Sequence, residues 1–329
     1  MYDIFFFEAF EEERNALRQA FSDQPETIGF TYKTIQEYGA SEPPAPVISI
    51  RTQSEIPVIW ASSLKGILTR STGYDHILAW LDRVDDNVSV PCGYLPKYCV
   101  RAVAEHAMLL WTALLRKLPC QQQQFQIFDR DGLTGLESCG KTLLVVGVGN
   151  IGSQIVALGE ALGMEVKGVD IDPGSADISY VAFAEGIREA DVIVSAMNLT
   201  KENRNYFNHK TLGQAKEGAV FVNIARGELA DTGDLLRLLD EGTLGGVGLD
   251  VFEDEPELIK ALRGGAEASR APTDSISRTL ALAGRRNVIV TPHNAFNSAE
   301  AVQRKAEQSA EQIQAFREHG DFLWPVPAQ

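Results

Sequence analysis

Residues 142–152 read TLLVVGVGNIG, and this stretch decides the fold of the chain. Its first half is an apolar run typical of a buried strand, and the stretch Ser153–Leu162 that follows it has helical spacing. The three glycines between them each have a mechanical purpose. Gly147 permits a tight turn, Gly149 lets a pyrophosphate approach the backbone, and Gly152 lets the helix pack against the strand. The stretch therefore predicts a strand, a phosphate-binding turn and a helix.

The same motif indicates which dinucleotide binds. Asn150 and Ile151 lie at the start of the helix, where unpaired N–H groups and the helix dipole favour an anion. Asp170 ends the next apolar run, about 20 residues after the motif, where a carboxylate can accept hydrogen bonds from ribose hydroxyls and repel a 2′-phosphate. A glycine-rich turn beside a surface aspartate is the alternative. We expect NAD as the cofactor rather than NADP.

Short apolar runs alternate with helical stretches from residue 142 to residue 291, as in a parallel sheet covered by helices on both faces. These runs are Thr142–Val148, Val166–Asp170, Asp191–Met197, Ala219–Ile224, Gly245–Val251 and Asn287–Thr291. They predict an α/β fold with a doubly wound parallel sheet, the Rossmann nucleotide-binding domain.

The first hundred residues predict a second, smaller α/β domain of flavodoxin-like type, which is completed by the C-terminal residues. Its expected elements are the strands Ile4–Phe7, Val47–Ile50 and Gly66–Thr69 and the helix Arg14–Phe21. A length of 329 residues also suits about two domains.

Two long helical stretches predict where the chain passes between the domains. Val100–Leu118 has apolar residues at helical spacing and predicts a linking helix, and Glu300–His319 predicts a helix that carries the chain back. We expect a substrate-binding domain at residues 1–100 and 300–329. The Rossmann domain then spans residues 101–299, with 101–118 as the linking helix. Residues 257–286 interrupt the pattern as an insertion to which the sequence assigns no role.

Composition excludes several classes of function. The chain has 45 Asp and Glu against 30 Lys and Arg, a net charge of −15, which repels nucleic acid and anionic membrane surfaces. The four cysteines and five histidines show no zinc-like spacing, so we expect no metal site, and reduced thiols in a cytoplasmic protein. The opening apolar run is short and turns acidic at once, which argues against a signal peptide or a membrane anchor.

Polar residues with catalytic chemistry follow the later strands. Arg226 lies in VNIARGEL, Asp250 and Glu255 lie in GLDVFEDEP, and His293 lies in VTPHNAF. Carboxyl ends of strands are where doubly wound sheets bind ligands, so these segments should converge. Hydride transfer at a carbonyl beside a carboxylate needs a cation, a proton donor and a group that tunes the donor. An arginine fork suits the carboxylate, and histidine changes charge near neutral pH.

At these motifs the chain resembles the D-isomer-specific 2-hydroxyacid dehydrogenase family, in its D-lactate dehydrogenase-like branch. GVGNIG, VNIARGEL, GLDVFEDEP and TPHNAF occur in the order and spacing of that family. The resemblance implies that Arg226 binds the substrate carboxylate and polarises the carbonyl. It also implies that Glu255 pairs with His293, which carries the proton, although Glu253, Asp254 and Glu257 are acidic neighbours of Glu255.

The resemblance extends to the remaining candidate residues. It implies that Asp250 holds the nicotinamide carboxamide, whereas by default this aspartate simply ends a strand. The backbone N–H groups of Thr72 and Gly73, in RSTGYDHI, would receive the substrate carboxylate. Tyr94 lies in VPCGYLP, which is similar to a VPxYxP loop with one extra residue before the tyrosine, and would line the pocket. Phe296 would be a second wall or a core residue.

The resulting hypothesis is an NAD-dependent oxidoreductase that interconverts a pyruvate-like 2-oxo acid and the D-2-hydroxy acid, and the resemblance also implies a homodimer. Glyoxylate or hydroxypyruvate reduction stays open, because one methylene in an apolar pocket changes discrimination by only about 1–3 kcal/mol. A dinucleotide-sensing corepressor of the same fold is the competing class. A panel of 2-oxo acids with NADH separates these functions.

Overall fold

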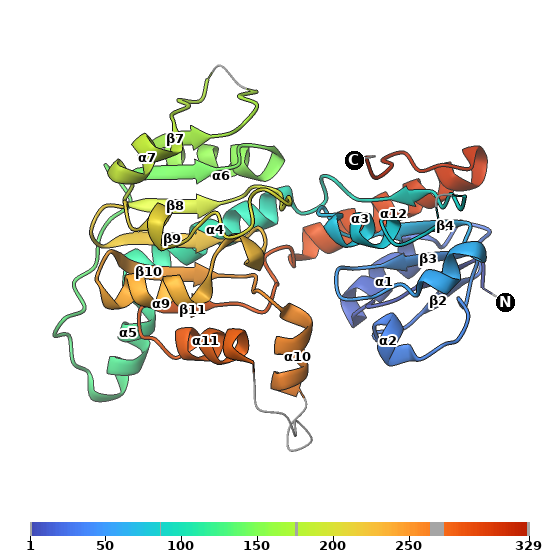
Figure 1. The fold of residues 1–329 in the computed structure, drawn as a ribbon, viewed down its shortest axis with the longest axis horizontal. Helices are drawn as coiled ribbons and strands as arrows, with labels where there is room; N and C mark the ends of the chain where they lie inside the picture. Colours follow the sequence, from blue (N-terminus) through green and yellow to red (C-terminus); the bar gives the residue numbers. More distant parts are fainter. Residues whose placement is uncertain (1, 86, 175–176, 264–272, 328–329) are drawn as a thin grey trace. The chain divides into compact units, whose positions relative to one another are not determined.

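The structure, a computed structural model, describes residues 2–85, 87–174, 177–263 and 273–327 (Figure 1). The chain divides into two compact units. The smaller unit is made of Met1–Cys99 and Asn297–Gln329, and the larger unit is Val100–Phe296. The divisions lie within three residues of the boundaries that the sequence predicts.

The larger unit contains a parallel sheet whose strand order is β11-β10-β9-β8-β6-β7. The strands are β6 (Thr142–Val146), β7 (Glu165–Val169), β8 (Val192–Ser195), β9 (Ala219–Asn223), β10 (Leu244–Leu249) and β11 (Val288–Val290). Each of the six predicted apolar runs forms one of them. The expected doubly wound α/β fold is therefore confirmed.

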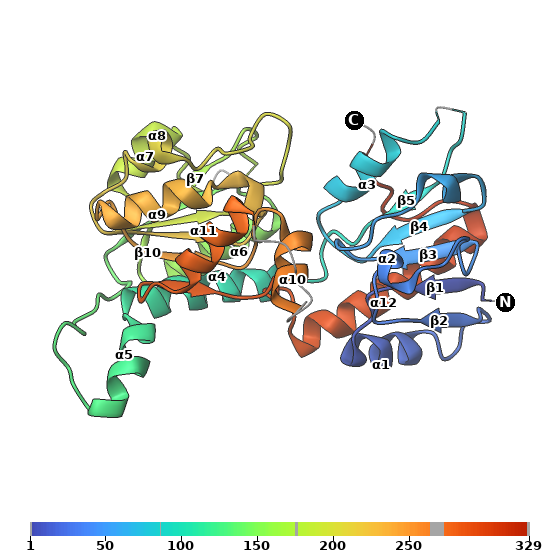
Figure 2. The ribbon, with the colours of Figure 1, turned by 60° about the horizontal axis from the view of Figure 1, so that its bottom comes forward.

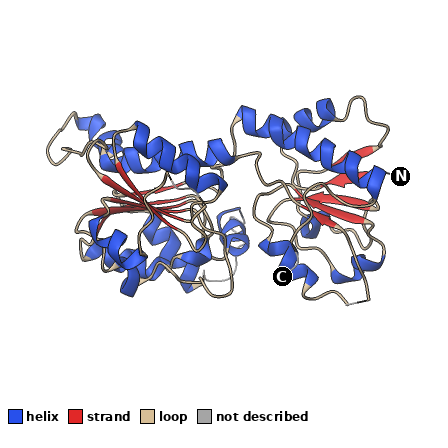
Figure 3. Cartoon of the chain, turned by 90° about the horizontal axis from the view of Figure 1, so that it is seen from above, coloured by secondary structure: helices blue, strands red, loops and turns tan. Residues whose placement is uncertain are grey.

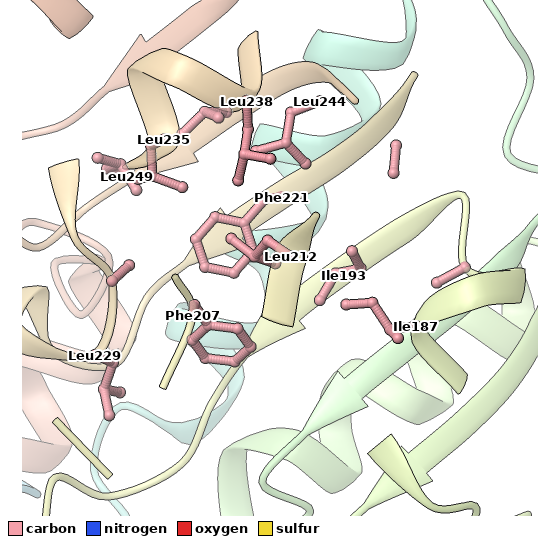
Figure 4. Packing of buried hydrophobic residues seen from close by; sticks show 14 of the residues in the cluster. Ile187, Ile193, Phe207, Leu212, Phe221, Leu229, Leu235, Leu238, Leu244 and Leu249 are labelled. Carbon is pink, nitrogen blue, oxygen red and sulfur yellow. The ribbon is translucent and has the colours of Figure 1, made fainter. Parts of the chain in front are cut away.

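Helices cover both faces of this sheet, as Figure 3 shows. The helical elements of the larger unit are α4 (Val100–Leu115), α5 (Leu118–Gln124), η2 (Phe125–Ile127), α6 (Asn150–Ala161), α7 (Phe183–Glu189), α8 (His209–Leu212), η3 (Gly227–Leu229), α9 (Thr232–Asp240), α10 (Glu255–Arg263) and α11 (Asp274–Ala283). On one face, Phe207 and Phe221 lie at the centre of a cluster of buried leucines and isoleucines (Figure 4). This apolar packing fixes the strands whose ends carry the candidate residues.

The order of strands reverses between β6 and β8, because the chain passes from β6 outward to β7 and then returns to β8. Beyond β7, Tyr180 makes a parallel bridge to Gly168 and extends the sheet by one residue pair. In open α/β sheets the crevice at such a reversal, outside the carboxyl ends of the strands, is where ligands bind. The glycine-rich turn after β6 lies at this point.

The smaller unit has its own parallel sheet, in the order β2-β1-β3-β4-β5. Its strands are β1 (Ile4–Phe6), β2 (Ile28–Phe30), β3 (Val47–Ile50), β4 (Gly66–Thr69) and β5 (Cys92–Gly93). The sequence predicted β1, β3 and β4 but not the two edge strands, β2 and β5. Residues near the C-terminus complete the unit, since Pro325 bridges Gly93 in antiparallel fashion.

Helices also lie on both faces of the smaller sheet (Figure 3). They are α1 (Glu11–Ala20), α2 (Ile35–Tyr38), η1 (Val58–Ser62), α3 (Asp75–Leu81) and α12 (Ala299–His319). Helices α1 and α12 pack against each other, although almost the whole sequence separates them (Figure 2). Trp60 and Trp80 belong to a buried cluster that also contains Ile35 from α2 and Ile77 from α3.

The predicted linking helix differs from the structure in two ways. It ends at Leu115 rather than Leu118, because Lys117 adopts a left-handed conformation with φ of 51° and a separate helix, α5, begins after it. Helix α4 also belongs wholly to the larger unit, where it packs on α6, β9 and β10. The chain therefore crosses between the units at Cys99–Val100 and not along the helix.

The insertion predicted at residues 257–286 contains most of α10 and all of α11. Helix α11 packs against α9 and β11, and Leu282 joins the main buried cluster. Residues 264–272, between the two helices, lie outside the described residues.

Candidate active site

The turn after β6 has the geometry that its three glycines predict. Gly147 has a φ of 94°, and a Cβ there would lie 2.5 Å from the backbone nitrogen of Met197 in the loop after β8. A Cβ on Gly152 would lie 2.0 Å from the carbonyl oxygen of Gly147. By contrast, the space beside Gly149 is open. Two glycines thus allow close backbone packing, and the third leaves room for a ligand.

Helix α6 begins at this turn with free hydrogen-bonding capacity. Its N-cap residue is Gly149, which has no side chain that could accept the first N–H groups of the helix. The N–H groups of Asn150, Ile151 and Gly152 belong to the first turn, where an α-helix offers no acceptor of its own. A pyrophosphate can take these donors and is favoured by the helix dipole. The residues present therefore fit the diphosphate of NAD.

Asp170 lies directly after β7 and is half-buried. Its Oδ2 accepts the N–H of Val148 at 2.6 Å, and its Oδ1 accepts the N–H of Asp172 at 3.0 Å. The carboxylate thus fixes the glycine-rich turn while its remaining lone pairs are available to a ribose hydroxyl. Asp172, its neighbour in sequence, is exposed.

His293 and Glu255 form a close pair. His293 Nδ1 lies 2.8 Å from Glu255 Oε2, and the two side chains are 24% and 18% exposed. Glu255 Oε1 also accepts the N–H of Phe252 at 3.2 Å, which holds the carboxylate in place. Among the acidic neighbours of Glu255, Glu257 instead pairs with Lys260 at 2.5 Å. The Nε2 atom is the one that can face a substrate, because Nδ1 is engaged by the carboxylate.

Glu253 lies in the same acidic segment but in a different setting. Burial raises the pKa of its carboxyl, and Asp254, Asp231 and Glu228 raise it further by repulsion, while Arg204 opposes them. A carboxyl under these influences is a weaker partner for an imidazolium than a fixed carboxylate.

Arg226 follows β9 on a turn that Asn223 shapes. The Asn223 amide donates to the carbonyl of Arg226 at 2.8 Å and accepts the N–H of Ala225 at 3.1 Å. Asn223 is 1% exposed, and its role is not among those that the motifs predict, although an asparagine that closes a turn is a known signal. The Arg226 guanidinium donates to the carbonyl of Ala225 at 2.8 Å.

The Arg226 loop and the Glu255 segment touch through their backbones. A Cβ on Gly227 would lie 1.8 Å from the carbonyl carbon of Phe252 and 2.2 Å from the nitrogen of Glu253. Only glycine permits this approach. The strands that precede the two segments, β9 and β10, are neighbours in the sheet, and β11, which precedes His293, is next to β10. The structure thus brings Arg226, Glu255 and His293 to one edge of one sheet.

Asp250 directly follows β10 and is 1% exposed. Its Oδ1 accepts the hydroxyl of Thr291 at 2.6 Å and the N–H of Asn294 at 2.8 Å, while Oδ2 accepts the N–H of Ala295 at 2.9 Å. His106, from α4, hydrogen-bonds to the Thr291 hydroxyl at 3.0 Å. These bonds give Asp250 a role in fixing the loop around His293, which the sequence did not suggest.

The predicted substrate turn lies in the smaller unit, after β4. Ser71 Oγ donates to the carbonyl of Gly73 at 2.6 Å, and Thr72 Oγ1 donates to the carbonyl of Leu95 at 3.2 Å. The N–H of Leu95 in turn donates to the carbonyl of Ser71 at 3.1 Å. The turn and the segment after β5 therefore form one structure, in which the N–H groups of Thr72 and Gly73 are expected to bind a carboxylate.

Tyr94 is fixed by its backbone despite the extra residue before it. Its N–H donates to the carbonyl of Trp324 at 3.1 Å, and its carbonyl accepts the side-chain amide of Gln312 at 2.7 Å. Its ring meets the ring of Tyr74 edge-on, with centroids 4.9 Å apart. The preceding Gly93 is required, because a Cβ would lie 2.5 Å from the ring of Phe322. Gln312 lies too far from Tyr94 in sequence to have been predicted.

Phe296, the second predicted wall, is 8% exposed in the larger unit. This burial agrees with the core interpretation that the sequence left open.

Other features of the described chain concern metals and membranes. Within residues 2–85, 87–174, 177–263 and 273–327, His, Cys, Asp and Glu form no group of three or more suited to a metal ion. In the same ranges no helix has the length and apolar character needed to cross a membrane. Cys92, Cys99, Cys120 and Cys139 are free thiols.

Comparison with known proteins identifies related sequences and structures. The family model described as "D-isomer specific 2-hydroxyacid dehydrogenase, NAD binding domain" matches residues 107–295. The 2-hydroxyacid dehydrogenase A of Aspergillus oryzae is 30% identical over 271 residues, which are 80% of this chain and 76% of that protein. The glycerate dehydrogenase of Methylorubrum extorquens is 32% identical over 232 residues, 67% of this chain and 66% of that protein.

A solved structure is similar along almost the whole chain. The D-lactate dehydrogenase from Aquifex aeolicus, complexed with NAD and lactic acid, has a TM-score of 0.83 and 28% sequence identity. The similarity covers 99% of this chain and 100% of that one.

Proposed function

The chain belongs to the D-isomer-specific 2-hydroxyacid dehydrogenase family, as an NAD-dependent enzyme similar to the D-lactate dehydrogenases, and we propose that it interconverts a pyruvate-like 2-oxo acid and the D-2-hydroxy acid. The observation that carries this proposal is the contact of 2.8 Å between His293 and Glu255, at the sheet edge that also holds Arg226. A proton carrier with a carboxylate partner and a nearby cation are what reduction of such a carbonyl requires.

His293 is the proposed proton carrier. With Nδ1–H donating to Glu255, Nε2 exchanges the proton with the substrate oxygen. The imidazolium donates this proton when the carbonyl is reduced, and the neutral ring accepts it when the hydroxyl is oxidised. Glu255 holds the ring in the required tautomer and stabilises the charged form.

Arg226, Thr72 and Gly73 are the proposed carboxylate-binding residues. The planar guanidinium of Arg226 can meet a carboxylate in two parallel hydrogen bonds and polarise the adjacent carbonyl. The N–H groups of Thr72 and Gly73 add neutral donors from the smaller unit. Tyr94 is the proposed wall for the substrate side chain. The resemblance also assigns Phe296 to this wall, but its 8% exposure favours a core role.

The cofactor is held by the turn and helix after β6. Gly147, Gly149, Asn150, Ile151 and Gly152 are the proposed pyrophosphate-binding residues, which the open space beside Gly149 and the uncapped start of α6 support. Asp170 is the proposed partner of the adenosine ribose. When bound, NAD supplies or takes up the hydride at its nicotinamide ring. The resemblance also assigns the carboxamide to Asp250, but the hydrogen bonds of Asp250 favour an anchoring role.

The loss of NADH absorbance with a panel of 2-oxo acids tests the proposal. We expect turnover with pyruvate, and the panel includes glyoxylate and hydroxypyruvate as the second candidates, supported by the glycerate dehydrogenase relative. Tight binding of NADH without turnover of any acid in the panel would contradict the enzyme and favour a dinucleotide sensor. Product analysis with a D-specific lactate assay establishes the stereochemistry.

We also propose a homodimer, on the basis of exposed apolar side chains that directly follow α5. Phe125, Ile127 and Phe128 are 73%, 75% and 70% exposed. Apolar clusters of this kind mark interaction sites. Light scattering should give about twice the chain mass of 36.0 kDa, and a value near 36.0 kDa would contradict the dimer.

A reducing, cytoplasmic compartment is the proposed location, which the four free thiols support. Cell fractionation with an antibody to the protein tests this location, and recovery in a secreted fraction would overturn it.

A further inference from the structure

Three charged side chains meet in the interior of the smaller unit, on elements far apart in sequence. They are Glu13 from α1, Arg70 directly after β4, and Lys305 from α12, and all three side chains are 0% exposed. Glu13 Oε1 lies 2.9 Å from Arg70 Nε and 2.8 Å from Lys305 Nζ. One carboxylate thus faces two cations, and we call these three residues the buried charge cluster.

Arg70 is fully engaged by its surroundings. Besides Glu13, it donates to the hydroxyl of Ser49 at 3.0 Å and to the carbonyl of Phe7 at 2.7 Å. Its guanidinium also lies 5.4 Å from the ring centroid of Phe6. These bonds fix Arg70, and hence the start of the turn at residues 71–73, to the sheet.

Lys305 has a different environment. Its ammonium lies 5.3 Å from the ring centroid of Phe10 and 5.4 Å from that of Tyr98. Burial lowers the pKa of Lys305 to about 8, although the attraction of Glu13 acts in the opposite direction. Burial alone would raise the pKa of Glu13, but Arg70 and Lys305 outweigh it and lower that pKa to about 2. At neutral pH the cluster holds one positive charge in excess.

Other ionisable groups around Lys305 do not remove this excess. Arg51, from the loop after β3, carries a further positive charge 5.6 Å from the Phe10 ring. Glu8, two residues after β1, accepts the N–H of Arg51 at 3.0 Å and offsets that charge. Arg304, on α12, donates to the carbonyl of Tyr98 at 2.9 Å and adds positive charge.

Tyr98 and Cys99 lie between Lys305 and the substrate turn, and both are neutral at pH 7. Burial raises the pKa of each group, while the charge of Lys305 acts against burial at the Cys99 thiol. The Cys99 sulfur lies 3.4 Å from the hydroxyl of Thr72. Two neutral residues, one in contact with Lys305 and the other with Thr72, therefore connect the excess charge to the turn.

We propose that Lys305 is a positioning residue whose buried charge attracts the carboxylate of the 2-oxo acid to the turn at residues 71–73. This inference rests on the proposed function. A buried charge is poorly screened by solvent and salt, so it acts on an anion that it does not touch. The substrate carboxylate balances the excess charge, which a neutral carbonyl compound cannot do. Lys305 therefore favours anionic substrates as a class.

Steady-state kinetics of the full-length protein with pyruvate, and inhibition by oxamate, test the proposal between pH 6.5 and 9.5. In Lys305→Met, which keeps the length of the side chain, the KM for pyruvate and the inhibition constant of oxamate should rise about 5- to 30-fold at pH 7. The kcat and the affinity for NADH should stay close to the parental values. Lys97→Met is the matched control, because it removes an exposed lysine from the same unit and should leave both constants unchanged.

The conservative variant separates the charge from the packing. The charge of Lys305 is present below a pH of about 8 and is lost above it, so the parental KM should rise there. Lys305→Arg keeps the charge at every pH and should suppress this rise, whereas a rise of any other origin would persist in every variant. A parental inhibition constant in Lys305→Met, or an unchanged rise in Lys305→Arg, would overturn the inference. Failure of the parent to turn over any 2-oxo acid would instead overturn the proposed function.

Discussion

Asp250 holds His293 through both its main chain and its side chain. The N–H of His293 donates to the carbonyl of Asp250 at 2.8 Å, and the Asp250 carboxylate accepts the next two N–H groups along the chain. His293 has a φ of 49°, in the left-handed region that residues other than glycine seldom adopt. The hydrogen bonds of Asp250 offset the cost of this conformation and fix the direction of the imidazole.

Asp250→Asn should lower kcat, because the new amide places an N–H₂ group against backbone donors and loosens the His293 loop. We expect a loss of about 10- to 100-fold in kcat, with a free energy of unfolding lower by about 1–3 kcal/mol. The dissociation constant of NADH, measured by fluorescence titration, should change by less than about 3-fold, which is less than the loss of a typical hydrogen bond to the cofactor would cause. A large loss of NADH affinity with kcat intact would instead support the carboxamide role.

Asp170→Ala should relax the preference for NADH over NADPH. The substitution removes a ribose acceptor and a charge that repels the additional phosphate, which together are worth about 10- to 150-fold in the ratio of kcat/KM values. Because Asp170 also accepts the N–H of Val148, the affinity for NADH itself should fall too. Asp172→Ala is the control and should leave the ratio unchanged. If the parent used both cofactors equally well, Asp170 would not be the discriminating residue.

Glu255→Gln should slow both reaction directions. The amide is neutral and can donate to Nδ1, so it supports the wrong tautomer of His293 and no longer stabilises the imidazolium. We expect kcat/KM to fall about 10- to 150-fold for pyruvate reduction and for lactate oxidation. Glu257→Gln, which removes a carboxylate paired with Lys260, should have little effect. Parental activity in Glu255→Gln would remove this glutamate from the mechanism.

Gly227→Ala should separate the Arg226 loop from the Glu255 segment. The new methyl group cannot fit at 1.8 Å from Phe252, so the backbones must move apart, at a cost of about 1–3 kcal/mol in the free energy of unfolding. A displacement of about 1 Å should reduce kcat/KM about 100-fold. Gly284→Ala is the matched control, since its nearest neighbour is 3.5 Å away and its φ of −78° suits alanine. Equal activities of the two variants would contradict this close packing.

The buried charge cluster predicts a loss of stability in acid. The pKa of Glu13 is lowered from 4.5 to about 2, so its contribution is fully present above pH 4.5 and is lost as the pH falls through 2. In urea unfolding, the free-energy difference between the parent and Glu13→Gln should therefore shrink by about 3 kcal/mol between pH 5 and pH 2. A difference independent of pH would show that Glu13 is not held as a carboxylate.

Local patterns predicted the elements of the larger sheet because most of its strands are short apolar runs rich in valine, isoleucine and leucine. The edge strand Cys92–Gly93 has no such pattern, because it depends on its pairing with β4 and on the bridge from Gly93 to Pro325 near the other end of the chain. The helix break at Lys117 could not be predicted either, because the apolar periodicity of the helix continues across this residue. The sequence motifs predict His293 and Glu255 as a pair. They do not predict the anchoring role of Asp250, because this role depends on how the loop that contains His293 folds back onto the end of β10.

The contacts of α12 have a consequence for how the protein is made. Residues 1–99 are synthesised first, yet α12 supplies Lys305 and Gln312, which complete that unit after residues 100–296 have been added. At about 5–20 residues per second, ribosomes need roughly 10–40 s for this intervening stretch. Throughout that interval the sheet of the smaller unit lacks one of its covering helices, so the nascent chain exposes apolar strands to chaperones and to aggregation. A circular permutant that begins at Asn297, with a linker that joins the original ends, would make the smaller unit continuous and should shorten that exposure.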